Sequence, residues 1–158
     1  ALGLNARPSD FQRSTIACTG IEFCKLAIVD TKDTATEAVK TLTRTMVDIQ
    51  LKRPISLHVN GCPNSCARIQ TADIGLKGQL LPDGNGGTEP GFQVHLGGGL
   101  ASRDRDEAGL GRTVRGLKVT ASNVSEYVER VTRKYVAEAN EDETFAEWAH
   151  RADEEALQ

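Results

Sequence analysis

The stretch LHVNGCPNSCARIQ, residues 57–70, decides how the middle of the chain folds. The apolar run at its start predicts a strand, Gly61 permits a sharp turn, and Pro63 suits the first position of a helix. Cys62 and Cys66 are four residues apart, so one helical turn would place both thiols on the same side. We therefore expect a strand, a turn and a helix start whose free backbone N–H groups face negative charge.

Four cysteines form two close pairs, Cys18 with Cys24 and Cys62 with Cys66. Soft thiolates suit an iron–sulfur cluster, which is the interpretation that this pattern favours. A structural zinc site stays open, although its paired cysteines are usually separated by about two to four residues. Four unrelated buried thiols also stay open. Structural disulfides are not expected, because the first 20 residues carry no secretory signal and cytosolic thiols stay reduced.

The composition is that of a globular domain, because 39% of the 158 residues are hydrophobic and 26% are charged. The length suits one compact domain. A net charge of −3 gives no electrostatic reason to bind nucleic acid. No apolar run approaches the length of a membrane span. We therefore expect no nucleic acid partner, no membrane partner and a cytoplasmic location.

Hydrophobic periodicity predicts two long helices. One begins after a Thr34–Glu37 capping box and ends before Pro54, and the other begins at Asn123. Strands are predicted over residues 14–17, 55–59, 72–77 and 91–96, with a loop rich in glycine and proline between the last two. This order predicts an α+β fold, in which helices cover one side of a mixed β-sheet.

The two ends of the chain differ from its middle. Residues 1–13 are interpreted as a lead-in segment, and residues 14–137 as the main domain. Residues 138–158 are strongly acidic, and Phe145 and Trp148 recur there at helical spacing. We expect an acidic C-terminal helix whose aromatic side chains dock on the domain.

Further candidate residues follow from local sequence. Gly97 and Gly98 follow a strand, where backbone without a Cβ could approach a cofactor carboxylate, or simply start a flexible loop. Asn64 and Ser65 lie between two cysteines and are candidates to donate hydrogen bonds to a bound cofactor, or merely form a tight turn. The histidines show no ligand spacing and are interpreted as structural: His58, His95 and His150.

The segments CTGIEFCKLA (residues 18–27) and NGCPNSCA (residues 60–67) resemble the siroheme and 4Fe-4S site of ferredoxin-type nitrite and sulfite reductases. The resemblance extends over roughly residues 10–155. It implies that one 4Fe-4S cluster is ligated by Cys18, Cys24, Cys62 and Cys66. It also implies that Cys66 is the axial ligand of the siroheme iron.

The same resemblance implies a function. The chain would be the C-terminal domain, over residues 14–137, of an assimilatory reductase that carries out six-electron reduction of sulfite to sulfide or nitrite to ammonia. Ferredoxin would be the electron donor. Together with the local sequence, the resemblance makes Cys66, Asn64, Gly97 and Gly98 the expected cofactor-binding residues, and no catalytic residue beyond the cofactor ligands is expected in this chain.

Members of that family are several times longer than this chain. Their earlier half supplies the basic residues that hold the substrate anion, so this chain alone is expected to be inactive and to need that half as its partner. One cluster also requires the four sulfurs to converge at the ends of adjacent strands, on one side of the sheet. The alternative function is a non-catalytic structural module in which the four cysteines bind zinc.

Metal analysis of the purified chain separates these two functions. We expect about four iron and four sulfide per chain with broad visible absorption, because thiolates hold such clusters. One zinc per chain and no colour would instead support the structural module.

Overall fold

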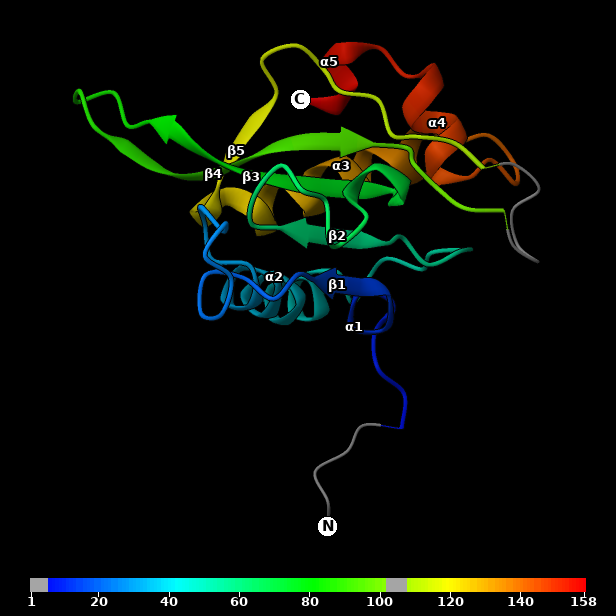
Figure 1. Ribbon diagram of the computed structural model, residues 1–158. Coiled ribbons are helices and arrows are strands. Elements are labelled where there is room, and N and C mark those ends of the chain that lie inside the picture. The colour runs from blue at the N-terminus through cyan, green and yellow to red at the C-terminus, as the bar shows by residue number, and fades with distance from the viewer. Residues whose placement is uncertain (1–5, 102–107) are drawn as a thin grey trace.

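The structure is a computed structural model that describes residues 6–101 and 108–158 (Figure 1). Within these residues the chain forms a 5-stranded sheet in the order β1-β2-β3-β4-β5. The strands are β1 (Thr15–Ala17), β2 (Leu57–Asn60), β3 (Ile74–Pro82), β4 (Thr88–Leu96) and β5 (Lys118–Thr120). The helices are α1 (Asp10–Ser14), α2 (Lys32–Thr45), α3 (Val124–Glu138), α4 (Phe145–Arg151) and α5 (Glu154–Leu157), with 3-10 turns η1 (Ile69–Thr71) and η2 (Ala121–Asn123).

The sheet is mixed. Strands β1, β2 and β3 are parallel, whereas β4 is antiparallel to β3 and β5 is antiparallel to β4. Because side chains alternate along a strand, the register places Leu57, Ile74 and Leu96 on one face. This face belongs to the hydrophobic core, which also includes residues of α2 and α3. Figure 1 shows both helices behind the sheet. The predicted α+β fold, with helices against one side of a mixed sheet, is confirmed.

The connection from β2 to β3 crosses the opposite face. Gly75 lies on that face, opposite His58 in the register, and a Cβ there would collide with the backbone carbonyl of Ile69. We call residues 61–73 the crossover strap. Glycine is needed at position 75 because the strap lies directly on the sheet backbone.

The start of α2 differs from the sequence prediction. The helix begins at Lys32, so the predicted Thr34–Glu37 capping box is wrong. Thr34 lies in the first turn, where its hydroxyl donates to the carbonyl of Asp30 at 3.0 Å. The Asp30 carboxylate accepts the N–H of Asp33 at 2.8 Å and satisfies one of the free donors at the helix start.

The β3–β4 hairpin is longer than the sequence predicts. The strands include residues 78–82 and 88–90, which were assigned to the loop, so that assignment is wrong. Only residues 83–87 form the turn, in which the carboxylate of Asp83 accepts the N–H groups of Asn85 and Gly87. The hairpin extends beyond the sheet on the same side as the loop that follows β1 (Figure 1). Strand β5 was not predicted, because three residues are too few to show periodicity.

The acidic end contains two short helices, α4 and α5, where one was predicted. A capping box formed by Thr144 and Glu147 starts α4, and Ala152 leaves the helical conformation with ψ 147°. Trp148 is fully buried and its ring centroid lies 5.7 Å from that of Tyr135 in α3. The aromatic side chains therefore dock on the domain. At the other end, residues 1–5 of the lead-in segment lie outside the described residues, and the rest includes α1.

Replacement Gly75→Ala tests the contact between the strap and the sheet. We expect a loss of about 3 kcal/mol in the free energy of unfolding, because a methyl group must displace backbone rather than a flexible side chain. Urea denaturation measures the change. Gly109→Ala is the matched control, since a Cβ there meets no atom within 4 Å. Equal stability of the two variants would contradict the close contact.

Candidate cofactor site

The two cysteine pairs lie at the ends of adjacent strands. Cys18 directly follows β1, and Cys62 follows β2 after one residue. Because β1 and β2 are parallel, both loops leave the sheet at the same end. The backbone N–H of Cys18 donates to the carbonyl of Val59 at 2.9 Å, and the N–H of Gly61 donates to the Cys18 Sγ at 3.3 Å. The second loop therefore directly contacts the first cysteine of the other loop.

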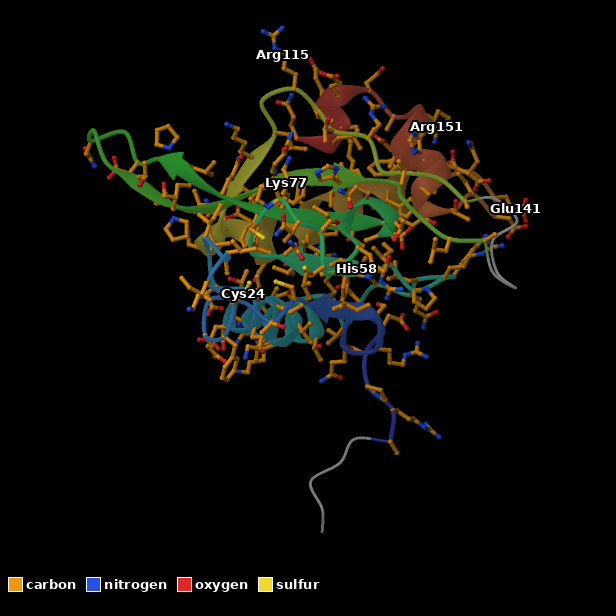
Figure 2. The ribbon with its side chains drawn as sticks, viewed as in Figure 1. Cys24, His58, Lys77, Arg115, Glu141 and Arg151 are labelled. Carbon is orange, nitrogen blue, oxygen red and sulfur yellow. The ribbon has the colours of Figure 1, made fainter. Side chains whose placement is uncertain are left out.

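A tight turn carries Cys24. Gly20 has a φ of +77°, and its carbonyl accepts the N–H of Cys24 at 3.0 Å. A side chain at Gly20 would also approach the hydroxyl oxygen of Thr31 to 2.6 Å. That hydroxyl donates to the carbonyl of Cys18 at 3.0 Å. Buried Thr31 therefore connects the start of α2 to the first cysteine, and Figure 2 shows Cys24 near this end of α2.

All four cysteines are free thiols, and their exposure differs. Cys62 is buried, Cys18 and Cys24 are half-buried, and Cys66 is exposed. Within residues 6–101 and 108–158, no group of three or more histidine, cysteine, aspartate or glutamate side chains is arranged to hold a metal ion. A single zinc ion needs its sulfurs about 2.3 Å from one point, whereas a 4Fe-4S cluster spreads its four thiolates over several irons.

The predicted helix start at Pro63 is wrong. Residues 61–68 form successive turns and bends, and the first helical residues are those of η1. Ser65 and Arg68 have φ values of 58° and 54°, in the left-handed region. Since a right-handed helix excludes this conformation, the two residues interrupt any helix through the second cysteine pair. Cys62 and Cys66 are therefore presented by a loop.

Asn60 is a residue of this site that sequence reasoning missed. Its side chain is fully buried at the end of β2. The Nδ2 group donates to the carbonyl of Cys62 at 2.7 Å, and the Oδ1 atom accepts the N–H of Ala67 at 2.8 Å. One side chain thus joins the two ends of the loop that contains Cys62 and Cys66. The sequence signal that could have indicated this role is a polar amide residue directly after the run that ends at Val59, because a buried amide needs hydrogen-bond partners.

The histidines have surroundings that agree with structural roles. His58 Nδ1 lies 3.2 Å from the carbonyl oxygen of Arg68 in the strap, and burial lowers the His58 pKa below its usual value. Burial also lowers the pKa of His95, with a smaller effect from the positive charge of Lys77. His150 Nε2 lies 3.1 Å from the carbonyl oxygen of Gly97.

The other predicted residues separate into two groups. Asn64 is exposed, and the Ser65 hydroxyl contacts the side-chain oxygen of Gln70, so both remain on the cysteine loop. Gly97 and Gly98 follow β4 and lie at the opposite end of the sheet, since β4 is antiparallel to β3. Their N–H groups donate to the carbonyls of Asp73 and Ala72, at 2.8 and 2.9 Å. This position gives no support to their expected contact with the same cofactor.

Exposed apolar side chains surround the first cysteine pair. They come from the loop after β1, and we call them the apolar rim: Ile21, Phe23, Leu26 and Ile28. Phe23 is 77% exposed and Leu26 is 64% exposed, although large apolar side chains are mostly buried in folded proteins. Four large apolar side chains are thus exposed on the loop that carries Cys18 and Cys24.

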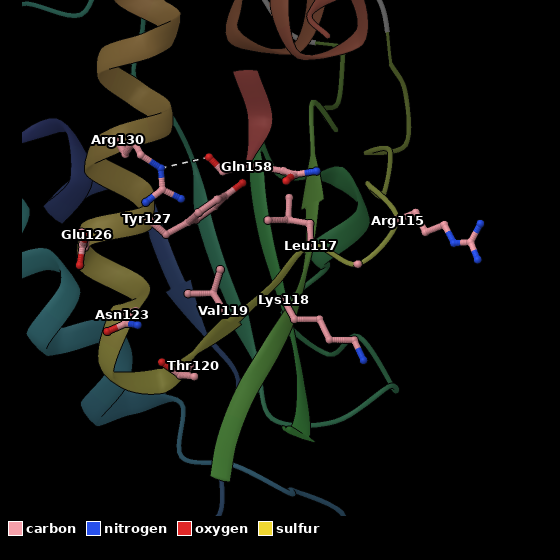
Figure 3. A pocket seen from close by; sticks show the side chains of 11 residues that line it. Arg115, Leu117, Lys118, Val119, Thr120, Asn123, Glu126, Tyr127, Arg130 and Gln158 are labelled. Carbon is pink, nitrogen blue, oxygen red and sulfur yellow. Dashed lines mark hydrogen bonds between the residues drawn. The ribbon is translucent and has the colours of Figure 1, made fainter. Parts of the chain in front are cut away.

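A cavity of about 450 Å³ lies between β5 and α3, away from the cysteines (Figure 3). The side chain of Arg130 closes one side, where its Nε donates to the carbonyl of Gln158 at 3.0 Å. Arg115 points away from the cavity in Figure 3. Because the positive side chains do not converge, this cavity offers no organised anion site.

Comparisons with known proteins agree with this geometry. Residues 9–158 match the family described as the nitrite and sulphite reductase 4Fe-4S domain, and the chain belongs to this family. Sulfite reductase (ferredoxin) 1 of Mycolicibacterium paratuberculosis is 54% identical over 99% of the chain, which covers 28% of that protein. The chloroplastic ferredoxin–nitrite reductase of Zea mays is 37% identical over 63% of the chain, which covers 17% of that protein.

Solved structures give the same result. The Mycobacterium tuberculosis NirA protein matches 99% of this chain with a TM-score of 0.92 and 50% identity, and the match covers 28% of that protein. Dissimilatory sulfite reductase I shares the fold with a TM-score of 0.65 at 16% identity. The chain therefore spans about 28% of the length of the Mycolicibacterium paratuberculosis sulfite reductase and of the NirA protein. No helix within the described residues is both long and apolar enough to cross a membrane.

The buried histidines predict a pH dependence of stability. A histidine whose pKa is lowered by folding stabilises the fold above its unfolded pKa of about 6.5, and this contribution is lost as the pH falls below that value. We expect the free energy of unfolding to fall from pH 7 to pH 5, by at most about 1.4 kcal/mol per pH unit for each histidine. His58→Gln should reduce the slope in urea titrations, and His95→Gln should act in the same direction. An unchanged slope in both variants would contradict the assignment.

Proposed function

We propose that Cys18, Cys24, Cys62 and Cys66 bind one 4Fe-4S cluster, and that Cys66 also ligates the iron of a siroheme. The observation that carries this proposal is the contact between the two cysteine loops, in which the Gly61 N–H donates to the Cys18 Sγ at 3.3 Å. Four free thiols on adjacent loops are the donor set that such a cluster requires. The family match over residues 9–158 supports the same cluster.

The protein's own groups set the properties of this site. An N–H donor stabilises negative charge on a thiolate, and hydrogen bonds to sulfur are among the factors that set a cluster's reduction potential. Buried Cys62 faces away from water, whereas exposed Cys66 is open to a second group. This difference in exposure supports Cys66 as the residue shared between the two cofactors.

We infer that the complete protein reduces sulfite to sulfide with electrons from ferredoxin. When bound, the two cofactors would carry these electrons to the substrate, because no side chain can do so. Sulfite is favoured over nitrite because the sulfite reductase relative is 54% identical over 99% of the chain. The nitrite reductase relative matches only 63% of the chain, at 37% identity.

We infer that the remaining part of the longer reductase covers the apolar rim. The matched region is 28% of such a protein, and the family resemblance implies that the other half holds the substrate anion. Burial of Phe23 and Leu26 at this junction would remove apolar surface from water beside the cysteines. The 158-residue chain alone is then inactive, and a cytoplasmic location stays a prediction.

The replacement Cys66→Ser tests the shared ligand in the complete reductase. We expect sulfite turnover to fall by about 100-fold or more, because a hydroxyl is a poor ligand for both cofactors. Turnover and the absorption spectrum are measured together. Ser122→Ala is the matched control, because Ser122 is exposed in η2 after β5, at the opposite edge of the sheet from the cysteine loops. Unchanged turnover in the Cys66→Ser enzyme would overturn the assignment.

A further inference from the structure

Asn60 occupies an unusual position for an amide side chain. It is the last residue of β2, its neighbour in the register is Lys77 of β3, and its exposed fraction is 0%. A buried amide is costly unless its donors and acceptors are satisfied. Its partners therefore show what the side chain does at this position.

Both partners lie on the cysteine loop. The carbonyl of Cys62 accepts from Nδ2 at 2.7 Å, and the N–H of Ala67 donates to Oδ1 at 2.8 Å. These two backbone groups lie on either side of the segment that carries Cys66. The Asn60 side chain therefore fixes the distance across the loop from a strand that is itself held on both edges.

The loop needs such support because its backbone is strained. Ser65 and Arg68 are both left-handed, a conformation that is unfavourable for a residue with a Cβ. Strained residues persist only where the surrounding structure determines their conformation. The two hydrogen bonds of buried Asn60 hold the backbone in this conformation, because they fix Cys62 and Ala67 at the two ends of the loop.

We propose that Asn60 is a positioning residue that fixes the Cys62–Cys66 loop before any cofactor binds. Through this loop it keeps the thiol of Cys62 buried and presents the thiol of Cys66 to the surface. The effect on loop shape concerns the protein alone. The effect on a bound cluster rests on the proposed function.

Two replacements separate the hydrogen bonds from side-chain volume. Asn60→Ala removes both bonds and leaves two buried backbone groups unsatisfied. Asn60→Asp retains an acceptor for the Ala67 N–H, but its carboxylate cannot donate to the carbonyl of Cys62. Tyr127→Phe is the control, because it removes a buried hydrogen bond of 2.9 Å to the carbonyl of Leu157 in a different part of the core.

The first measurement uses the cofactor-free chain and iodoacetamide. Labelling of Cys62 and Cys66 is followed by mass spectrometry, and the ratio of the two rates reports loop shape. In the native sequence Cys66 should react much faster than Cys62. We expect both Asn60 variants to raise the Cys62 rate by about 10-fold or more relative to Cys66, as loss of a buried hydrogen bond predicts. Tyr127→Phe should leave the ratio unchanged.

The second measurement uses the chain reconstituted with iron and sulfide. We expect both Asn60 variants to lose iron to a chelator about 10- to 100-fold faster, the usual effect of removing a group that orients a metal ligand. The spectrum of the reduced cluster and its reduction potential should change as well. Tyr127→Phe should retain the native spectrum and potential.

The outcomes distinguish the two proposals. If the native chain takes up no cluster, the proposed function fails, while the labelling ratio still decides the role of Asn60. An unchanged ratio in both Asn60 variants would overturn the positioning role. An equal change in Tyr127→Phe would also overturn it, because the effect would then arise from general loss of stability.

Discussion

The parallel pairing of β1 with β2 is the constraint on which the site depends. Paired parallel strands run in the same direction, so the loops that follow β1 and β2 leave the sheet at the same end. The bond from the Cys18 N–H to the carbonyl of Val59 continues this pairing beyond the last residue of β1. Two cysteine pairs that are far apart in the sequence thereby become neighbours, and the Gly61 N–H reaches the Cys18 sulfur.

The two faces of the sheet have different tasks. One face is apolar and packs against α2 and α3, which supplies most of the buried core. The other face holds the crossover strap, through buried polar side chains of β2 and the missing side chain of Gly75. A rigid core on one side can thus hold an irregular loop in place on the other. Precise placement of ligands requires support of this kind.

The end of the sheet that carries the cysteine loops exposes apolar side chains to solvent. Exposed apolar side chains surround the first pair, and the β3–β4 hairpin extends beyond the sheet on the same side. The chain also spans only about 28% of the sulfite reductase and of the NirA protein that it matches. These observations agree with a domain that folds around its own core and presents its functional end to the rest of a longer protein.

The resemblance of residues 18–27 and 60–67 to a known family identified that family, and hydrophobic periodicity predicted the mixed sheet, because motifs and periodicity are local properties of the chain. Ligation of one cluster by the four cysteines stays a prediction. Sequence reasoning failed where neighbours distant in sequence decide the structure. The left-handed residues Ser65 and Arg68 replaced the expected helix. The direction of β4 places Gly97 at the opposite end of the sheet from the cysteine loops, whereas its expected contact with a cofactor stays untested. The two hydrogen bonds of the Asn60 side chain could not be predicted either, since the role of a buried asparagine depends on which backbone groups the fold brings to it. Tertiary structure decides such features because a buried polar group or a strained backbone is stable only within a complete set of contacts.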